Sequence, residues 1–116
     1  MTDEASRHAF EKLESFANVP DPLSHPVAQA VLQANRMGAS APTIPMYLYH
    51  SVFDQLIPYS SAVQLNADWC ARGGRVQFVT DLLSEHISYA FTGAPGALLY
   101  LMDRVDGRTT PSSCPR

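Results

Sequence analysis

The sequence has few charged residues and no strong excess of either sign. Asp, Glu, Lys and Arg make up 16% of its 116 residues, and the formal net charge at pH 7 is −3. The sequence therefore has neither the basic stripe that binds nucleic acid nor a polybasic patch for a membrane surface. Apolar runs long enough to span a bilayer are also missing. These absences argue against a nucleic-acid partner and against a transmembrane segment.

Several sequence signals are missing as well. The first residues, Met-Thr-Asp-Glu-Ala-Ser-Arg, lack the positive region and the apolar region of a signal peptide. A complete chain would on this ground be expected in the cytoplasm, but a truncated chain would show the same start. There is no glycine-rich phosphate loop and no cluster of metal ligands, so we expect no cofactor and no metal.

Cysteine is rare. Cys70 and Cys114 lie too far apart in the sequence for a zinc or redox motif. One possibility is a disulfide that links the C-terminal tail, residues 108–116, to a helix. The other is that both cysteines are free thiols. The polar tail gives little reason for a core cysteine at position 114, which favours the disulfide. The chain-entropy model values such a bridge at roughly 4 kcal/mol.

What the sequence does contain is a globular composition, with 46% hydrophobic residues in a length that allows one domain at most. Hydrophobic periodicity and the positions of proline and glycine predict its elements. Two strands are expected, over Met46 to Tyr49 and Arg75 to Thr80. The expected helices run from a cap at Thr2 or Asp3 to about Ala17, from Val27 to Met37 with Gly38 as terminator, from Pro58 to about Arg72, from Ser88 to Phe91, and from Pro95 to Val105.

Helical spacing also predicts which side chains share a face. Four sets of residues have this spacing. The first two should each share one helix face, the third should face the sheet, and the fourth should face the core. The four sets are Phe10, Leu13 and Phe16; Val27, Val31 and Leu32; Val63, Ala67 and Cys70; and Leu98, Leu99, Met102 and Val105.

A strand, a helix and a strand with short connections make a βαβ unit, which predicts an α/β fold with two parallel strands and about four helices. Two strands are too few for a stable independent sheet. The apolar strand from Met46 to Tyr49 is typical of a central strand buried on both faces. The first strand therefore needs a neighbour that this sequence does not offer, which suggests part of a larger domain.

A carboxylate follows the first predicted strand, and a histidine follows the second. Asp54 and His86 should meet, because the carboxyl ends of parallel strands lie at one edge of a sheet, where catalytic groups collect. A carboxylate that accepts from the histidine Nδ1–H fixes the tautomer and stabilises the imidazolium. Each residue alone has an ordinary explanation, a turn or helix cap for Asp54 and a surface or packed histidine for His86. Together they match the acid and base of a Ser-Asp-His triad.

Other titratable residues fit a catalytic role less well. His50 ends the first strand, and we expect it to pack or to hydrogen-bond to the backbone near the site. His8 and His25 are expected in solvent. Glu85 could compete with Asp54 as the partner of His86, but adjacent side chains usually point apart.

The nucleophile of such a triad is missing. No Gly-x-Ser-x-Gly motif occurs, and the strained strand-to-helix turn that presents a catalytic serine requires those glycines. No loop for an oxyanion hole can be identified either. The candidate serines all lack these glycine neighbours, and they are Ser51, Ser60, Ser61, Ser84 and Ser88.

Four segments in order resemble the secretory lipase family of α/β-hydrolases, found in actinobacteria and fungi. Tyr49 to Pro58 is similar to the family's strand and acid loop, with the usual pattern His-Gly-x-x-Asp-x-x-Val-Pro. Trp69 to Val76, Ser84 to Ser88, and Leu101 to Gly107 followed by Cys114 resemble the helix end and next strand, the histidine segment, and the C-terminal helix with its closing cysteine. The similarity extends from about Pro22 onward. Ser51 departs from the pattern, since glycine is usual there.

The resemblance implies that residues 1–116 are the C-terminal part of an α/β-hydrolase domain, without the nucleophile elbow. It implies a secreted, triacylglycerol-lipase-type enzyme of lipid catabolism, with Asp54 and His86 as acid and general base on lipid or other carboxylic esters. Without its serine the chain should be inactive alone, and a complementary N-terminal chain would be its partner. The alternative is a non-catalytic interaction module, or a truncated remnant, that docks a partner through its exposed sheet edge.

Overall fold

The computed structural model describes residues 7–8 and 11–115, and the chain divides into two compact units, Met1–Met37 and Gly38–Arg116. The first unit contains two short 3-10 helices, η1 (Leu13–Phe16) and η2 (Pro22–Ser24), and the helix α2 (Pro26–Ala34). Proline in the first turn of α2 costs no hydrogen bond, because the first backbone N–H groups of a helix have no partner inside it. The His25 ring caps this helix by accepting the Val27 N–H at 3.3 Å.

Two helix predictions in the first unit are wrong. Glu11 and Lys12 are not helical, and only the short η1 follows them, so no continuous helix reaches Ala17 in the described residues. An isolated helix of this length is marginal without packing, and Phe16 is 60% exposed. The predicted caps Thr2 and Asp3, and Phe10, lie outside the described residues.

The second helix ends at Ala34 rather than at Met37. The Asn35 side chain donates to the Val31 carbonyl at 2.8 Å and so closes the last turn. Gly38 does not end the helix; it takes a positive φ of 87° in the turn that follows. The helix ends just before Asn35 because the short asparagine amide competes with backbone N–H groups for the helix carbonyls.

The second unit contains the sheet. Its elements are β1 (Met46–Ser51), α3 (Tyr59–Ala71), β2 (Val76–Asp81), α4 (His86–Thr92) and α5 (Ala94–Val105). The two strands are parallel, with Met46 opposite Val76 and Ser51 opposite Asp81. The predicted α/β fold with a βαβ unit is confirmed, and four α-helices occur in the described residues.

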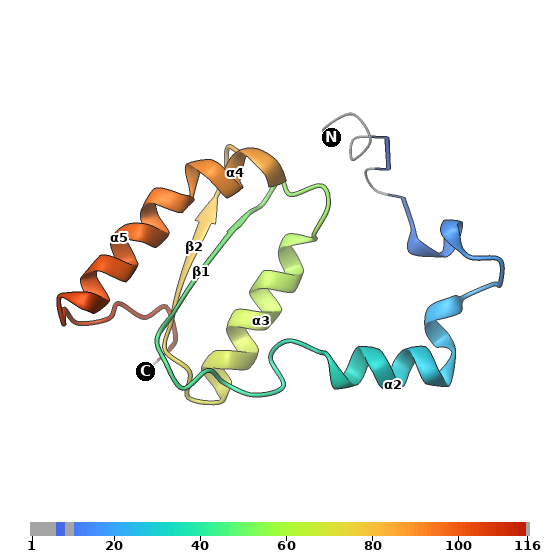
Figure 1. Cartoon of the computed structure of the whole chain (residues 1–116), viewed down its shortest axis with the longest axis horizontal. Helices are drawn as coiled ribbons and strands as arrows, with labels where there is room; N and C mark the ends of the chain where they lie inside the picture. The colour runs from blue at the N-terminus through green and yellow to red at the C-terminus, as the bar shows by residue number, and fades with distance from the viewer. Residues whose placement is uncertain (1–6, 9–10, 116) are drawn as a thin grey trace. The chain divides into compact units, whose positions relative to one another are not determined.

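Helices cover both faces of the sheet, with α3 on one side and α4 and α5 on the other (Figure 1). Successive strand residues point to opposite faces, so the tyrosines of β1 share one of them. Tyr47 packs on Tyr100 of α5 at 5.2 Å between ring centroids, and Tyr49 packs on Tyr89 of α4 at 5.3 Å. On the other face, Tyr59 of α3 stacks on a strand β2 residue, Phe78, at 5.9 Å.

The predicted inward faces of α3 and α5 are wrong. On α3 the buried residues are Ala62 and Trp69, whereas Val63 is 42% exposed. On α5 the buried residue is Tyr100. The aliphatic stripe of α5 predicted to face the core is more than half exposed at every position, Leu98, Leu99, Met102 and Val105.

Strand β1 is also less buried than predicted, since the sequence indicated a strand buried on both faces. It is mostly half-buried and, in the described residues, pairs with β2 alone. Apolar residues thus line surfaces that no other described element of the second unit covers.

The C-terminal tail returns to the sheet. Cys114 forms a disulfide with Cys70 of α3, which confirms the disulfide prediction. The Ser113 N–H donates to the Val76 carbonyl at 2.7 Å, and the Phe78 N–H donates to Ser113 Oγ at 3.0 Å. The tail therefore occupies part of the outer edge of β2, while the outer edge of β1 has no strand beside it in the described residues. No helix in the described ranges has the length and hydropathy needed to cross a membrane.

Candidate active site

The loop after β1 holds Asp54 rigidly. Its Oδ1 accepts the N–H groups of Leu56 at 2.9 Å and Ile57 at 2.7 Å. Short polar side chains commonly close turns in this way. The side chain is only 6% exposed, and its second oxygen, Oδ2, points at the neighbouring loop. Asp54 therefore closes the turn with one carboxylate oxygen and leaves the other free to contact the neighbouring loop.

The loop after β2 is closed by Asp81, whose Oδ2 accepts the N–H groups of Leu83 at 3.0 Å and Ser84 at 2.5 Å. The Ser84 hydrogen bond is the main cause that lowers the pKa of Asp81. Ser51 joins this loop to the first one. Its buried hydroxyl donates to the Ser84 carbonyl and accepts the Phe53 N–H at 3.1 Å.

Asp54 and His86 meet at the carboxyl edge of the sheet. His86 is the first residue of α4, and its Nδ1 lies 2.6 Å from Asp54 Oδ2. An ionised carboxylate only accepts, so Nδ1 carries the proton and Nε2 is the nitrogen that can take one from a substrate or nucleophile. The His86 side chain is 30% exposed and so remains accessible.

The charged form of Asp54 is favoured in this site. Burial alone would raise its pKa, but hydrogen bonds from the Ile57 N–H, from His86 and from the Leu56 N–H outweigh it, and the pKa lies below the usual 3.8. A carboxylate that stays ionised beside a histidine is what the acid of a triad requires.

Glu85 has a different role from Asp54. Its carboxylate caps α4 by accepting the N–H groups of Ile87 at 2.9 Å and Ser88 at 2.7 Å, and it also contacts the Ser88 hydroxyl. The Ser88 hydroxyl, followed by the Ile87 N–H and Gln55, lowers the pKa of Glu85 from 4.5 to about 2. Glu85 thus binds the helix start and Gln55, while the His86 ring is bound by Asp54.

His50 borders the same carboxylate. Its Nδ1 lies 2.9 Å from the Ser51 carbonyl, and its Nε2 lies 3.5 Å from Asp54 Oδ2. The side chain is 13% exposed and packs near Tyr59. The structure thus places it against the backbone of the site, as the sequence predicts. His8 and His25 belong to the first unit, where His8 contacts Glu11 and His25 caps α2.

A small hollow of about 200 Å³ opens over the Asp54–His86 pair. In the described residues no serine hydroxyl bonds to His86, and the one serine at this hollow, Ser51, is buried and donates to Ser84. The hollow therefore contains an acid and a base without a nucleophile. It is lined by Tyr49, His50, Ser51, Asp54, Ile57, His86, Tyr89 and Ala90.

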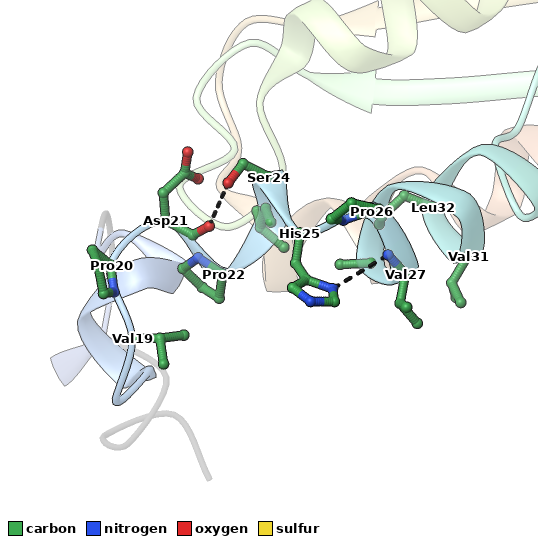
Figure 2. Close-up of a pocket in the computed structure, with 12 residues that line it drawn as sticks. Val19, Pro20, Asp21, Pro22, Ser24, His25, Pro26, Val27, Val31 and Leu32 are labelled. Carbon is green, nitrogen blue, oxygen red and sulfur yellow. Dashed lines mark hydrogen bonds between the residues drawn. The ribbon is translucent and has the colours of Figure 1, made fainter.

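A larger hollow, about 920 Å³, lies within the first unit (Figure 2). Its walls are mainly proline and aliphatic side chains, among them Val27, Val31 and Leu32 of α2. Some of the polar groups there bind within the chain, since the His25 ring caps the helix and the Asp21 backbone carbonyl accepts the Ser24 hydroxyl at 2.9 Å. In the described part of the chain no three His, Cys, Asp or Glu side chains gather as a metal site would need.

The likeness to known proteins agrees with this geometry. A model of the secretory lipase family matches residues 4–113. The chain belongs to the secretory lipase family. Lipase A of Arthroderma benhamiae is 39% identical to this family member over 92 residues, covering 79% of the chain and 20% of the relative. A secreted triacylglycerol lipase of Malassezia furfur is 30% identical over 124 residues, covering 100% of the chain and 32% of the relative.

A solved structure supports the fold. The crystal structure of Candida antarctica lipase A matches 84% of this lipase-family chain with a TM-score of 0.76, at 22% sequence identity. The match covers 24% of that lipase's chain. The chain therefore shares part of the α/β-hydrolase fold and spans a third or less of the length of the curated relatives it matches.

Sequence reasoning missed Gln55, which lies between the two loops, and the burial of Ser51. Ser51 carried a signal, because it stands where the family usually has glycine and glycine could not donate to Ser84. Gln55 gave no such signal, since its partners lie about 30 residues away and depend on how the loops fold together.

Proposed function

We propose that this chain is the acid–histidine part of a serine ester hydrolase that acts on lipid or other carboxylic esters, of the triacylglycerol lipase type. The observation that carries the proposal is the 2.6 Å contact between His86 Nδ1 and Asp54 Oδ2 beside an accessible hollow. Family membership supports the substrate class, because the relatives it matches are named lipases. Asp54 and His86 are the proposed acid and general base.

In this mechanism His86 Nε2 accepts the proton of a serine hydroxyl as its oxygen attacks the ester carbonyl carbon. The tetrahedral intermediate collapses when the imidazolium returns that proton to the leaving alkoxide, which departs as an alcohol. Water then attacks the acyl-serine with His86 again as base, releasing the fatty acid and restoring the serine. Asp54 stabilises the imidazolium in both halves through Nδ1–H.

The serine and the oxyanion hole are proposed to come from the N-terminal part of such a domain, as a complementary chain or segment. Two surfaces of the second unit suit it. Among the described residues no strand pairs with the outer edge of β1, and the exposed aliphatic stripe of α5 offers apolar area. An open edge invites pairing with another strand. The chain alone is then expected to be inactive.

We also propose an extracellular location for this enzyme. Disulfides persist in oxidising compartments, and Cys70 is bonded to Cys114. The Malassezia relative is by name a secreted lipase.

The alternative, a non-catalytic interaction module, would use the same open edge of β1. It gives no reason for an ionised, nearly buried carboxylate to hold an accessible histidine in one tautomer. The catalytic interpretation accounts for both features, with docking as its first step.

The test has two arms. The purified chain, beside its His86→Ala variant, is assayed for hydrolysis of a short-chain p-nitrophenyl ester. We expect no activity from either. Activity that vanishes in the variant would mean that this chain contains its own nucleophile or activates water, and the proposed missing serine would be wrong.

In the second arm, this chain replaces the matching C-terminal segment of the Arthroderma relative. The chimera should hydrolyse the ester, and His86→Ala should lower kcat by about 10⁶-fold, because members of a triad act as a unit. His8→Ala, which changes an exposed histidine of the first unit, is the matched control and should retain activity. A chimera that tolerates His86→Ala would contradict the assigned base.

A further inference from the structure

We infer that Gln55 is a positioning residue for His86, and that its side-chain amide fixes the backbone of the general base while Asp54 fixes its ring. This inference rests on the proposed function for its purpose, since it concerns the same histidine. The contacts that carry it lie between the loop after β1 and the start of α4, and the proposed mechanism does not use them.

Gln55 reaches two consecutive residues of the other loop. Its Oε1 accepts the backbone N–H of His86 at 3.2 Å, and its Nε2 donates to Glu85 Oε2 at 3.2 Å. All three residues are half-buried. The orientation of the amide is fixed by its partners, because a backbone N–H only donates and a carboxylate only accepts.

Glutamine is suited to this position by its chemistry. The His86 N–H is one of the first N–H groups of α4, which have no partner within the helix. A methionine of similar length could satisfy neither contact. A glutamate could accept from His86 but would face the Glu85 carboxylate, and a lysine could bind Glu85 but would leave the His86 N–H unpaired.

The adjacent residues Asp54 and Gln55 therefore hold His86 at two points. Asp54 Oδ2 binds ring Nδ1 at 2.6 Å, and Gln55 Oε1 binds the backbone N–H. One contact alone lets the ring pivot, whereas two restrict both its direction and its distance from the loop. Asp54 is itself held by the Leu56 and Ile57 N–H groups, so the carboxylate that binds the His86 ring has a fixed position.

The experiment follows the His86 Nδ1 proton by NMR in the full chain. In Gln55→Met, we expect its exchange with water to become about tenfold faster, which corresponds to the loss of one hydrogen bond. The backbone amide of His86 should lose protection in the same variant. Gln64→Met is the matched control, because Gln64 makes one exposed hydrogen bond, to Asp68 on α3, and the His86 proton should not respond.

A second set of variants keeps the test independent of folding. Gln55→Glu alone places two carboxylates together and should also accelerate the exchange. Combining Gln55→Glu with Glu85→Gln removes the repulsion between the two carboxylates, so the exchange should be slower than in Gln55→Glu alone. An unchanged His86 proton in Gln55→Met, or exchange in the double variant that is no slower than in Gln55→Glu alone, would overturn the inference. These signals do not depend on ester hydrolysis, so an inactive chimera would count against the proposed function and leave the inference standing.

Discussion

At the scale of single residues, the two oxygens of Asp54 do separate things. Oδ1 closes a turn by accepting backbone N–H groups, and Oδ2 holds the ring of His86. A turn-forming aspartate and a catalytic aspartate are often treated as competing interpretations, but here the turn is what makes Oδ2 rigid. Glu85, one residue before the histidine, uses its carboxylate on the helix start and on Gln55.

The carboxylate of Glu85 predicts a pH dependence of stability. Because its pKa falls from 4.5 to about 2 on folding, its stabilising contribution is complete above pH 4.5 and is lost as the pH falls toward 2. In Glu85→Gln, the free energy of unfolding should therefore decrease less between pH 6 and pH 3 than in the original chain. Urea unfolding followed by circular dichroism at both pH values measures this. Glu14→Gln, an exposed glutamate in the first unit, controls for the loss of a carboxylate, and equal pH dependence in Glu85→Gln and the original chain would contradict the assignment.

At the scale of elements, helix packing shows where periodicity was insufficient. Apolar residues occur on more than one side of α3 and α5, so spacing alone could not choose the inward face. On α5 the inward face is the one that carries Tyr100, which packs on Tyr47 with the two rings tilted. Gly96 of the same helix allows that close approach, because a Cβ there would lie 2.7 Å from the Tyr47 hydroxyl oxygen.

This close approach gives a paired prediction. Gly96→Ala alone should destabilise the chain by about 1–3 kcal/mol through overpacking against the hydroxyl. In a Tyr47→Phe background the obstructing oxygen is gone, and the same change should stabilise by about 1 kcal/mol through the better helix propensity of alanine. Denaturant unfolding of the four proteins measures the cycle. Equal effects of Gly96→Ala in both backgrounds would show that the contact is not limiting.

At the scale of the whole molecule, the two edges of the sheet differ. The tail and the disulfide secure the β2 edge, whereas the β1 edge and the stripe on α5 are open in the described residues. A two-stranded sheet is marginal alone. The disulfide should therefore carry a large share of the stability of this chain.

Replacing both cysteines, Cys70→Ser with Cys114→Ser, should lower the free energy of unfolding by roughly 4 kcal/mol, since the bridge closes a loop with a sequence separation of 44 residues. Denaturant unfolding with and without reductant measures the effect. Reductant should lower the free energy of unfolding of the original chain and leave that of the double variant unchanged. If the original chain proved insensitive to reduction, the tail would be held by its contacts with β2 and not by the bridge.

Much of the fold and the proposed pair followed from the sequence. The strands and the helix between them were predicted because prolines and glycines bound the elements, and the disulfide because the polar tail gives little reason for a core cysteine at position 114. Asp54 and His86 could be paired because the carboxyl ends of parallel strands share an edge. The first helix and the inward faces of α3 and α5 could not be derived, because they depend on contacts with other elements.

The sequence by itself determined which groups follow each strand, because connectivity alone carries Asp54 and His86 to the same edge. Only the tertiary structure decided how they are held. The Ser51 contact with Ser84 and the Gln55 contacts with Glu85 and His86 join residues about 30 positions apart. Such contacts form only when two loops fold against each other, and no local spacing encodes them.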